Sequence, residues 1–376
     1  MTEAGESPPG AVGRILAAAV TDGVPVVAGV PVVAGVPGLT AAVGRGPRTL
    51  ASWALGQADT VTPRPVQPDT VFDLASLTKV VATTTVTLAL AGQGLIGLDD
   101  QVIKHLPAAT QLAAPEVTVR QLLTHTAGLP GSVKFYEWCT DRDQLLHELY
   151  ATPLEIPPGA RVVYSDLGFM MLGEMAAAVT SEPLDTLFRR LVSEPLGMAD
   201  TGYLSDPAAG GLPAGGFAST ELRADGTPWT GVVHDENARV MGGVAGHAGL
   251  FSTAADLAKF AAWWVGHDDG AGPVPAALRR DSERCQTPGL DGRRGLGWVR
   301  IGDRYDILGV AWPDSAVSHT GFTGTSLALD APSGVWVVLL TNEVHYGRGR
   351  GVIRPLREGV HAAVAAAVLD PAARSR

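Results

Sequence analysis

The most informative segment of the sequence is Phe72-Asp73-Leu74-Ala75-Ser76-Leu77-Thr78-Lys79. Asp73 is suited to cap a helix, and the apolar pattern that follows predicts one from about residue 74 to residue 90. This helix is almost entirely apolar or threonine, and a helix without a charged face is normally buried. Ser76 and Lys79 are three residues apart and share one face of it. The segment therefore predicts a serine hydroxyl beside a lysine amine in a place poor in water.

That environment suggests a chemistry for the Ser-x-x-Lys pair. Burial and neighbouring positive charge lower the pKa of a lysine, so that a neutral amine accepts the serine proton. The start of a helix also stabilises negative charge that develops nearby. The spacing is common in unrelated proteins, so it predicts acyl transfer only together with other elements.

Two such elements follow along the chain. Tyr164-Ser165-Asp166 comes after a loop that contains Pro157-Pro158-Gly159, and His319-Thr320-Gly321 lies at the end of a predicted strand. Ser-x-x-Lys, Tyr-x-Asp and His-Thr-Gly, in this order, resemble the serine β-lactamase and penicillin-binding protein superfamily, and most closely its class C and family S12 esterase branch. The segments Leu122–Leu129 and Gly249–Ala254 fit the same family. The resemblance extends from about residue 11 to residue 368.

The order of predicted elements is consistent with this fold. Strands are predicted near both chain ends, at residues 39–43, 49–55, 297–301, 316–320, 325–329 and 335–340, with helices and long loops between them. The predicted helices include a short one capped by Thr118, one over residues 166–191 and one from Thr253 to about residue 265. This pattern predicts an α+β protein in which an antiparallel sheet is flanked by helices and joined to a mostly helical region, with the active site between them. We expect a disordered N-terminus (1–10), a sheet domain (11–75 and 290–376) and a helical domain with active-site loops (76–289).

The resemblance implies roles for particular residues. Ser76 is expected to be the nucleophile that forms an acyl-enzyme, and Lys79 to hold it and share its proton. Tyr164 is expected to activate the nucleophile and to protonate the leaving group. The motifs leave open whether Lys79 or Tyr164 is the main base. The oxyanion hole would be formed by the backbone N–H groups of Ser76 and Phe322.

The residues expected to bind substrate are Asp166, His319, Thr320, Gly321 and His247. Two of them depart from the family pattern. Many relatives have asparagine where Asp166 stands, and a carboxylate there favours a charged Lys79 and repels anionic substrates. Relatives that bind penicillins or D-alanyl peptides usually have lysine where His319 stands, and a neutral histidine anchors a carboxylate poorly. Both departures argue against β-lactam hydrolysis and D,D-peptidase action, and both are compatible with esters.

Other polar residues are interpreted more simply. His247 and His234 lie in Gly-rich or acidic segments that we expect to line the cleft, and they are thirteen residues apart without helical spacing, so no metal site is predicted. His125 is expected to bond to the end of a helix. The aromatic stretch Lys134–Trp138 is either a rim of the cleft or part of the core. No cofactor is expected.

Composition narrows the class of partner. The chain has 376 residues, 46% of them hydrophobic, and a formal charge of −10, which excludes a disordered chain and argues against nucleic acid or an anionic membrane as partner. The basic cluster Arg348, Arg350, Arg354 and Arg357 is interpreted as a solvated face. The acidic N-terminus lacks a basic signal region, which favours the cytoplasm.

The function predicted from these observations is hydrolysis of a small-molecule carboxylic ester or amide through an acyl-Ser76 intermediate. The first alternative is a transacylase of secondary metabolism, which passes the acyl group to an amine or alcohol. Less favoured are a D,D-peptidase or β-lactamase and a binding protein that is acylated without turnover. The expected partners are a small acyl donor and, for a transacylase, an acceptor; the oligomeric state is not predicted.

Overall fold

The central sheet joins the two ends of the chain. The computed structural model describes residues 8–21, 35–112, 116–204, 216–266 and 272–369. Within them a seven-stranded antiparallel sheet has the order β3-β2-β1-β10-β9-β8-β7. Its strands are β1 (Gly38–Arg45), β2 (Arg48–Asp59), β3 (Arg64–Pro65), β7 (Val299–Arg300), β8 (Val317–Thr320), β9 (Ser326–Asp330) and β10 (Val335–Thr341). Residues 39–45 of β1 pair with residues 335–341 of β10, which confirms the predicted sheet built from both termini.

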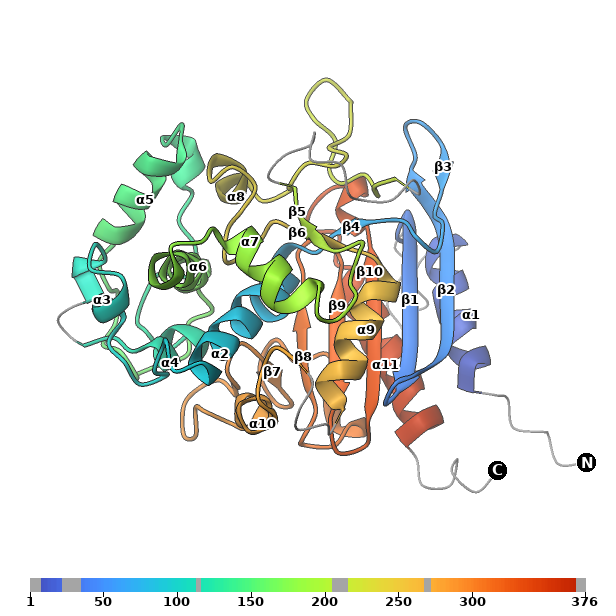
Figure 1. Cartoon of the computed structure of the whole chain (residues 1–376). Helices are drawn as coiled ribbons and strands as arrows, with labels where there is room; N and C mark the ends of the chain where they lie inside the picture. Colours follow the sequence, from blue (N-terminus) through green and yellow to red (C-terminus); the bar gives the residue numbers. More distant parts are fainter. Residues whose placement is uncertain (1–7, 22–34, 113–115, 205–215, 267–271, 370–376) are drawn as a thin grey trace, which may run out of the picture.

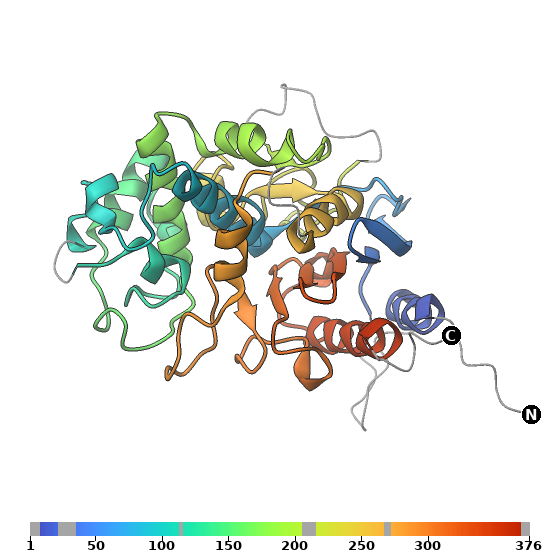
Figure 2. The same cartoon turned by 60° about the horizontal axis from the view of Figure 1, so that its bottom comes forward.

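Helices cover both faces of this sheet (Figures 1 and 2). On one face α1 (Pro8–Thr21) packs against α11 (Ile353–Val364), and their apolar side chains form a core with those of β1 and β10. On the other face α9 (Ala254–Val265) packs against β1 and β10. All seven residues of β10 are buried, as expected for a strand covered on both sides.

The segment that carries Ser76 and Lys79 begins less regularly than predicted. A short 3-10 turn, η1 (Ala75–Leu77), is followed by π-helical turns, η2 (Lys79–Thr84), and only then by α2 (Thr85–Gly92). Residues 75–92 are apolar and long enough to cross a membrane, but 83% of them are buried inside the protein. They therefore form a core helix of this fold, as the missing charged face indicated.

Around this segment pack the helices of the second region. They include α3 (Val102–His105), α4 (Val119–Leu123), α5 (Arg142–Ala151), α6 (Asp166–Thr180), α7 (Leu184–Phe188), α8 (Glu236–Val240) and α10 (Ala276–Glu283). The predicted helix over residues 166–191 is two helices, because Ser181 adopts a left-handed conformation with φ +58° and Pro183 follows. Thr118 and Thr253 cap α4 and α9 as predicted.

A small second sheet connects the two regions. Its strand order is β4 (Phe72–Asp73), β6 (Leu250–Ser252) and β5 (Gly202–Tyr203). It places the residues just before Ser76 against the Gly249–Ala254 segment, although nearly 180 positions of sequence separate them. The segment that carries Ser76 is thereby fixed between the large sheet and the helical region.

Two predictions about the chain's organisation need comment. Residues 8–10 begin α1, so the prediction that they are disordered is wrong, and residues 1–7 lie outside the described part. The domain limits 11–75, 290–376 and 76–289 stay a prediction. Helix α9 falls within 76–289 by sequence and nevertheless packs on the sheet.

Candidate active site

The turn before Ser76 is strained and tightly fixed. Ala75 has φ +46°, in the left-handed region that non-glycine residues rarely adopt. The N–H of Ala75 donates to Asp73 Oδ1 at 2.8 Å. From the loop after β8, Thr323 Oγ1 donates to the Asp73 carbonyl at 2.7 Å and Thr325 Oγ1 donates to the Leu74 carbonyl at 3.0 Å. These bonds hold the strained turn and fix the position of the Ser76 hydroxyl.

Lys79 is fully buried and its ammonium group has three acceptors. Nζ donates to Ser76 Oγ at 2.9 Å and to the His247 carbonyl at 3.1 Å, and lies 2.7 Å from Asp166 Oδ1. Burial alone would lower the pKa of Lys79, but the Asp166 carboxylate and Tyr164 outweigh it and raise the pKa above its ordinary value. Of the two expectations for Lys79, a neutral amine from burial and a charged one favoured by Asp166, the structure supports the second, and the ammonium ion holds Ser76.

Tyr164 lies between Lys79 and a histidine that the sequence did not assign to the site. Lys79 Nζ lies 4.9 Å from the centroid of the Tyr164 ring. The His125 ring packs 4.6 Å from that ring, and its Nδ1 accepts a hydrogen bond from the Ser165 N–H at 3.0 Å. His125 also has a positive φ of +59°. It therefore positions the Tyr164–Asp166 segment, in addition to ending a helix, and the only sequence signal for this was its place in the family-like segment Leu122–Leu129.

The strand end that carries His319 packs directly on the Ser76 turn. The Gly321 N–H donates to the Thr325 carbonyl at 2.7 Å, and a Cβ at Gly321 would lie 2.3 Å from the Leu74 carbonyl oxygen, so only glycine fits. Burial, Lys79 and Arg294 hold the pKa of His319 well below its usual range. His319 is therefore neutral, as predicted, and Nδ1 lies 2.9 Å from the Thr320 carbonyl.

Phe322 provides the second predicted oxyanion donor. In the described part of the chain its N–H makes no hydrogen bond. Its side chain is 55% exposed and stacks on the His234 ring with 5.7 Å between the ring centroids. The backbone of this residue is thus open toward the same space as Ser76.

A pocket of about 360 Å³ opens beside these residues. Its wall contains the predicted residues Ser76, Tyr164, His319, Thr320, Gly321 and Phe322. It also contains four arginines, Arg294, Arg348, Arg350 and Arg357, which we call the arginine wall. The interpretation of the basic cluster as a solvated face is wrong for Arg357, which is buried in α11, whereas Arg348 is 42% exposed at the pocket.

Two arginines of this wall are buried. Arg294 donates to Asp303 Oδ1 at 3.0 Å, whereas its Nε and Nη1 have no hydrogen-bond partner among the described residues. Its guanidinium lies 5.7 Å from the Tyr164 ring centroid. Arg357 Nη2 donates to the carbonyls of Gly321 and Thr325 at 2.7 Å each, and burial lowers the pKa of Arg357 to about 9, so it stays charged at neutral pH. Arg357 thus supports the strand end from behind.

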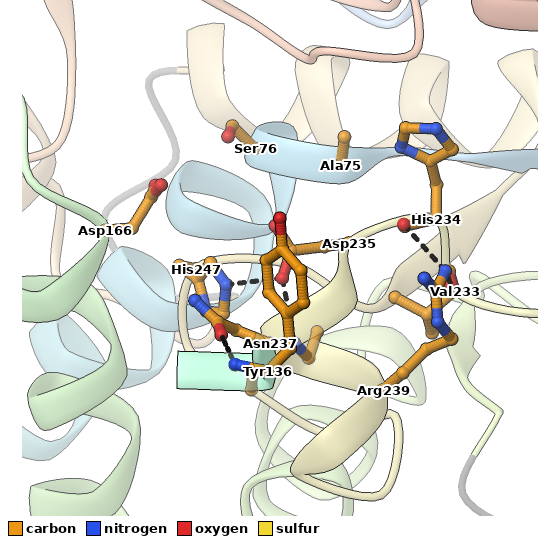
Figure 3. Close-up of polar contacts among 12 residues, drawn as sticks. Ala75, Ser76, Tyr136, Asp166, Val233, His234, Asp235, Asn237, Arg239 and His247 are labelled. Carbon is orange, nitrogen blue, oxygen red and sulfur yellow. Dashed lines mark hydrogen bonds and ion pairs between the residues drawn. The ribbon is translucent and has the colours of Figure 1, made fainter. Parts of the chain in front are cut away.

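Figure 3 shows the side chains of Asp166 and Asp235 below the turn that carries Ser76, and we call these two carboxylates the carboxylate wall. His247 Nε2 lies 2.9 Å from Asp235 Oδ1, and the His247 side chain is 2% exposed. Because the His247 side chain is buried, the structure does not favour the predicted contact with substrate. The His247 carbonyl instead accepts from Lys79, and its ring contacts Asp235. In the described part of the chain, no three His, Cys, Asp or Glu side chains are grouped so as to hold a metal ion.

The predicted site residues therefore converge on one place, although their roles stay predictions. A serine hydroxyl held by a buried lysine, next to a tyrosine and an open backbone N–H, is a site of the class that transfers acyl groups through serine.

Comparison with known proteins defines the family. The family model described as Beta-lactamase matches residues 27–361. The chain belongs to the Beta-lactamase family.

Its relatives carry several activities. A "Putative D-alanyl-D-alanine carboxypeptidase" of Escherichia coli (strain K12) is 32% identical over 308 residues, which cover 73% of this chain and 70% of the relative. An "N-acetylmuramyl-L-alanine amidase" of Bacillus subtilis (strain 168) is 31% identical and the match covers 75% and 70%. Among solved structures, EstCE1, "a hydrolase with promiscuous acyltransferase activity", has a TM-score of 0.69 at 22% identity and the match covers 94% of this chain and 98% of that one.

Proposed function

We propose that the protein hydrolyses a small-molecule carboxylic ester or amide through an acyl-Ser76 intermediate. The observation that carries this proposal is the hydrogen bond from the buried, Asp166-paired Lys79 to Ser76 Oγ at the edge of an open pocket. Membership of the Beta-lactamase family supports the same chemistry.

The charge of Lys79 bears on the first step. An ammonium ion has no lone pair, so the proton of Ser76 must go to another group, and Tyr164 is the candidate beside Lys79. Tyr164 accepts the Oγ proton and passes a proton on to the leaving atom, while Oγ bonds to the carbonyl carbon of the donor. The oxyanion accepts hydrogen bonds from the N–H groups of Ser76 and Phe322. The bond between the carbonyl carbon and the leaving atom then breaks, and water later hydrolyses the acyl-Ser76 ester, which releases the acid and restores the Ser76 hydroxyl.

A second candidate is hydrolysis of a peptide-type amide that carries a carboxylate. The names of the curated relatives favour it, and so does the arginine wall. His319 is neutral and anchors a carboxylate poorly, but Arg294 and Arg348 lie in the same pocket and provide the charge that His319 lacks. Acyl transfer to an amine or alcohol in place of water remains an alternative outcome of the same intermediate, and the cytoplasmic location stays a prediction.

The test is the mass of the intact protein after brief exposure to a panel of small esters, an acyl-D-alanyl-D-alanine peptide and a muramyl-peptide amide. We expect a mass gain equal to the acyl group in the wild type and none in Ser76→Ala. The donor that gives the fastest adduct identifies the substrate class. Absence of any adduct and of any turnover with all donors would contradict the proposal.

A further inference from the structure

Asp235 has one carboxylate oxygen that the protein uses and one that it leaves open. Within the described chain, the carboxylate makes two hydrogen bonds, and both involve Oδ1. One comes from the Ala238 N–H at 2.8 Å, and the other is with His247 Nε2 at 2.9 Å. Its side chain is 32% exposed, whereas His247 below it is 2% exposed. The histidine and the start of α8 thus fix the carboxylate in one orientation, with Oδ2 free to accept from a ligand.

Two chains of hydrogen bonds connect the Asp235 segment to Lys79 and to the Ser76 turn. Asp235 is joined to Lys79 through His247, whose carbonyl accepts from Lys79 Nζ at 3.1 Å. The adjacent residue, His234, donates its N–H to Asp73 Oδ2 at 2.7 Å, and Asp73 Oδ1 holds the Ser76 turn. Figure 3 shows the Asp235 carboxylate below the turn that carries Ser76, with Asp166 on the same side.

The charge of Asp235 argues against a role as general base and favours the binding of a cation. Burial would raise its pKa, but His247, the Ala238 N–H and Lys79 lower it well below its usual range. A carboxylate with so low a pKa is a poor general base, because an effective base titrates near the working pH. It is a good partner for a cation. Lys79 is already neutralised by Asp166 at 2.7 Å, so Asp235 is the carboxylate of this wall without a lysine or arginine partner in the described chain.

We infer that Asp235 is a specificity-determining residue whose Oδ2 accepts from a protonated amine of the acyl donor, with His247 as its positioning residue. The inference rests on the proposed acyl-Ser76 chemistry and narrows its substrate to donors that carry an ammonium group. Together with the arginine wall it predicts a donor with a positive charge on one side of the scissile bond and room for a negative charge on the other.

The experiment compares 4-nitrophenyl esters of unbranched aminoalkanoic acids, from three to six carbons long, with alkanoyl esters of equal length that end in methyl. Each rate is divided by the uncatalysed rate of the same ester. We expect the wild type to prefer the best amino ester by about 10-fold or more in kcat/KM, as for a charge-assisted hydrogen bond. In Asp235→Asn this ratio should fall to about 1, mainly through KM.

The chain offers suitable controls. Asparagine caps a helix as well as aspartate does, so Asp235→Asn should keep α8 folded. Glu236→Gln removes the next carboxylate, which pairs with Arg348 at 2.6 Å, and should keep the ratio within about 2-fold of the wild type. A ratio that is equal in the wild type and in Asp235→Asn would overturn the inference.

Failure of the proposed function has a different signature. If neither ester forms an adduct on Ser76, the acyl-enzyme proposal fails, and Asp235 is judged on binding alone. Hexylammonium and hexanol are then titrated against the wild type and Asp235→Asn by calorimetry. Binding of hexylammonium to the wild type only, with none of hexanol, supports the site. Equal binding to both proteins, or no binding of hexylammonium, overturns it.

Discussion

The carboxylate wall and the arginine wall differ in how their charged groups are used. Beside the carboxylate wall, Lys79 is fully buried, and its ammonium group contacts Ser76 Oγ, the His247 carbonyl and Asp166 Oδ1. Its charge therefore holds Ser76 in place. On the arginine wall, Arg294 keeps two guanidinium nitrogens without hydrogen-bond partners in the described chain, and Arg348 is 42% exposed. The charge of Lys79 is used internally to hold Ser76, whereas the exposed Arg348 can attract an anion through solvent.

The difference explains why the net charge of the chain does not describe the charge around the site. The chain has a formal charge of −10, and Asp166 and His319 suggest a site without attraction for anions. The arginine wall adds cationic groups from segments distant in the sequence, around residues 294 and 348–357. Local potential depends on which charges face the pocket and which are already paired.

The largest effect on the rate of Ser76 acylation is expected from removing the buried charge of Lys79. Lys79→Met leaves Ser76 Oγ without its donor and Asp166 without its cation, and the rate of Ser76 acylation should fall by about 10³-fold. Lys259→Met is a matched control, because Lys259 also lies 2.7 Å from an aspartate, Asp256, but on α9. Intact-mass kinetics measure both. An acylation rate within a few-fold of the wild type in Lys79→Met would show that the lysine does not organise the serine.

A smaller effect is expected from replacing the carboxylate that pairs with Lys79. Asp166 raises the pKa of Lys79 against the effect of burial, so Asp166→Asn should lower it. Since the lysine must be charged to hold Ser76, activity is lost as the pH rises through this pKa. In the wild type that loss lies above the ordinary lysine range.

In Asp166→Asn burial is no longer opposed by the carboxylate, so the alkaline limb of kcat/KM should appear below the ordinary lysine pKa, with about 10-fold lower activity one pH unit above that limb and no such loss in the wild type. A pH profile from 6 to 10.5 measures the shift. Asp256→Asn, which removes the partner of Lys259, should leave the limb in place. An unchanged limb in Asp166→Asn would mean that the charge of Lys79 does not limit the reaction.

Much of the fold could be predicted because its signals are local. Alternating apolar strands and threonine caps are readable in short windows, and β1, β10 and α9 lie where they were expected. The division of residues 166–191 was missed because it depends on one residue, Ser181, in a left-handed conformation. The π-helical start of the helix that carries Lys79 was missed because no apolar spacing in residues 79–84 distinguishes a π-helical turn from an α-helical one.

The site was predictable only where its members belong to motifs. Ser76, Lys79, Tyr164 and His319 were found by resemblance, and the structure brings them together. For the Lys79 pKa, burial and Asp166 predicted opposite directions, and only the 2.7 Å distance between Lys79 Nζ and Asp166 Oδ1 shows that the carboxylate outweighs burial. Arg294 and Asp235 were not assigned, because a buried arginine or an open carboxylate oxygen is defined by its neighbours in space and leaves no spacing in the sequence.

The smallest effect is expected at the exposed end of the arginine wall. Arg348 pairs with Glu221 at 2.7 Å and with Glu236 at 2.6 Å, and these partly exposed pairs contribute little to stability. Arg348→Gln should therefore fold normally. It should lower kcat/KM about 3-fold for esters whose leaving group carries a carboxylate, and leave neutral esters unchanged, because a half-exposed charge attracts an anion through solvent. The loss should disappear at 0.5 M salt, where screening removes the attraction. Equal losses for anionic and neutral esters would instead indicate that Arg348 shapes the pocket through the Phe322 ring, 5.6 Å away, and that the arginine wall attracts no anion at this end.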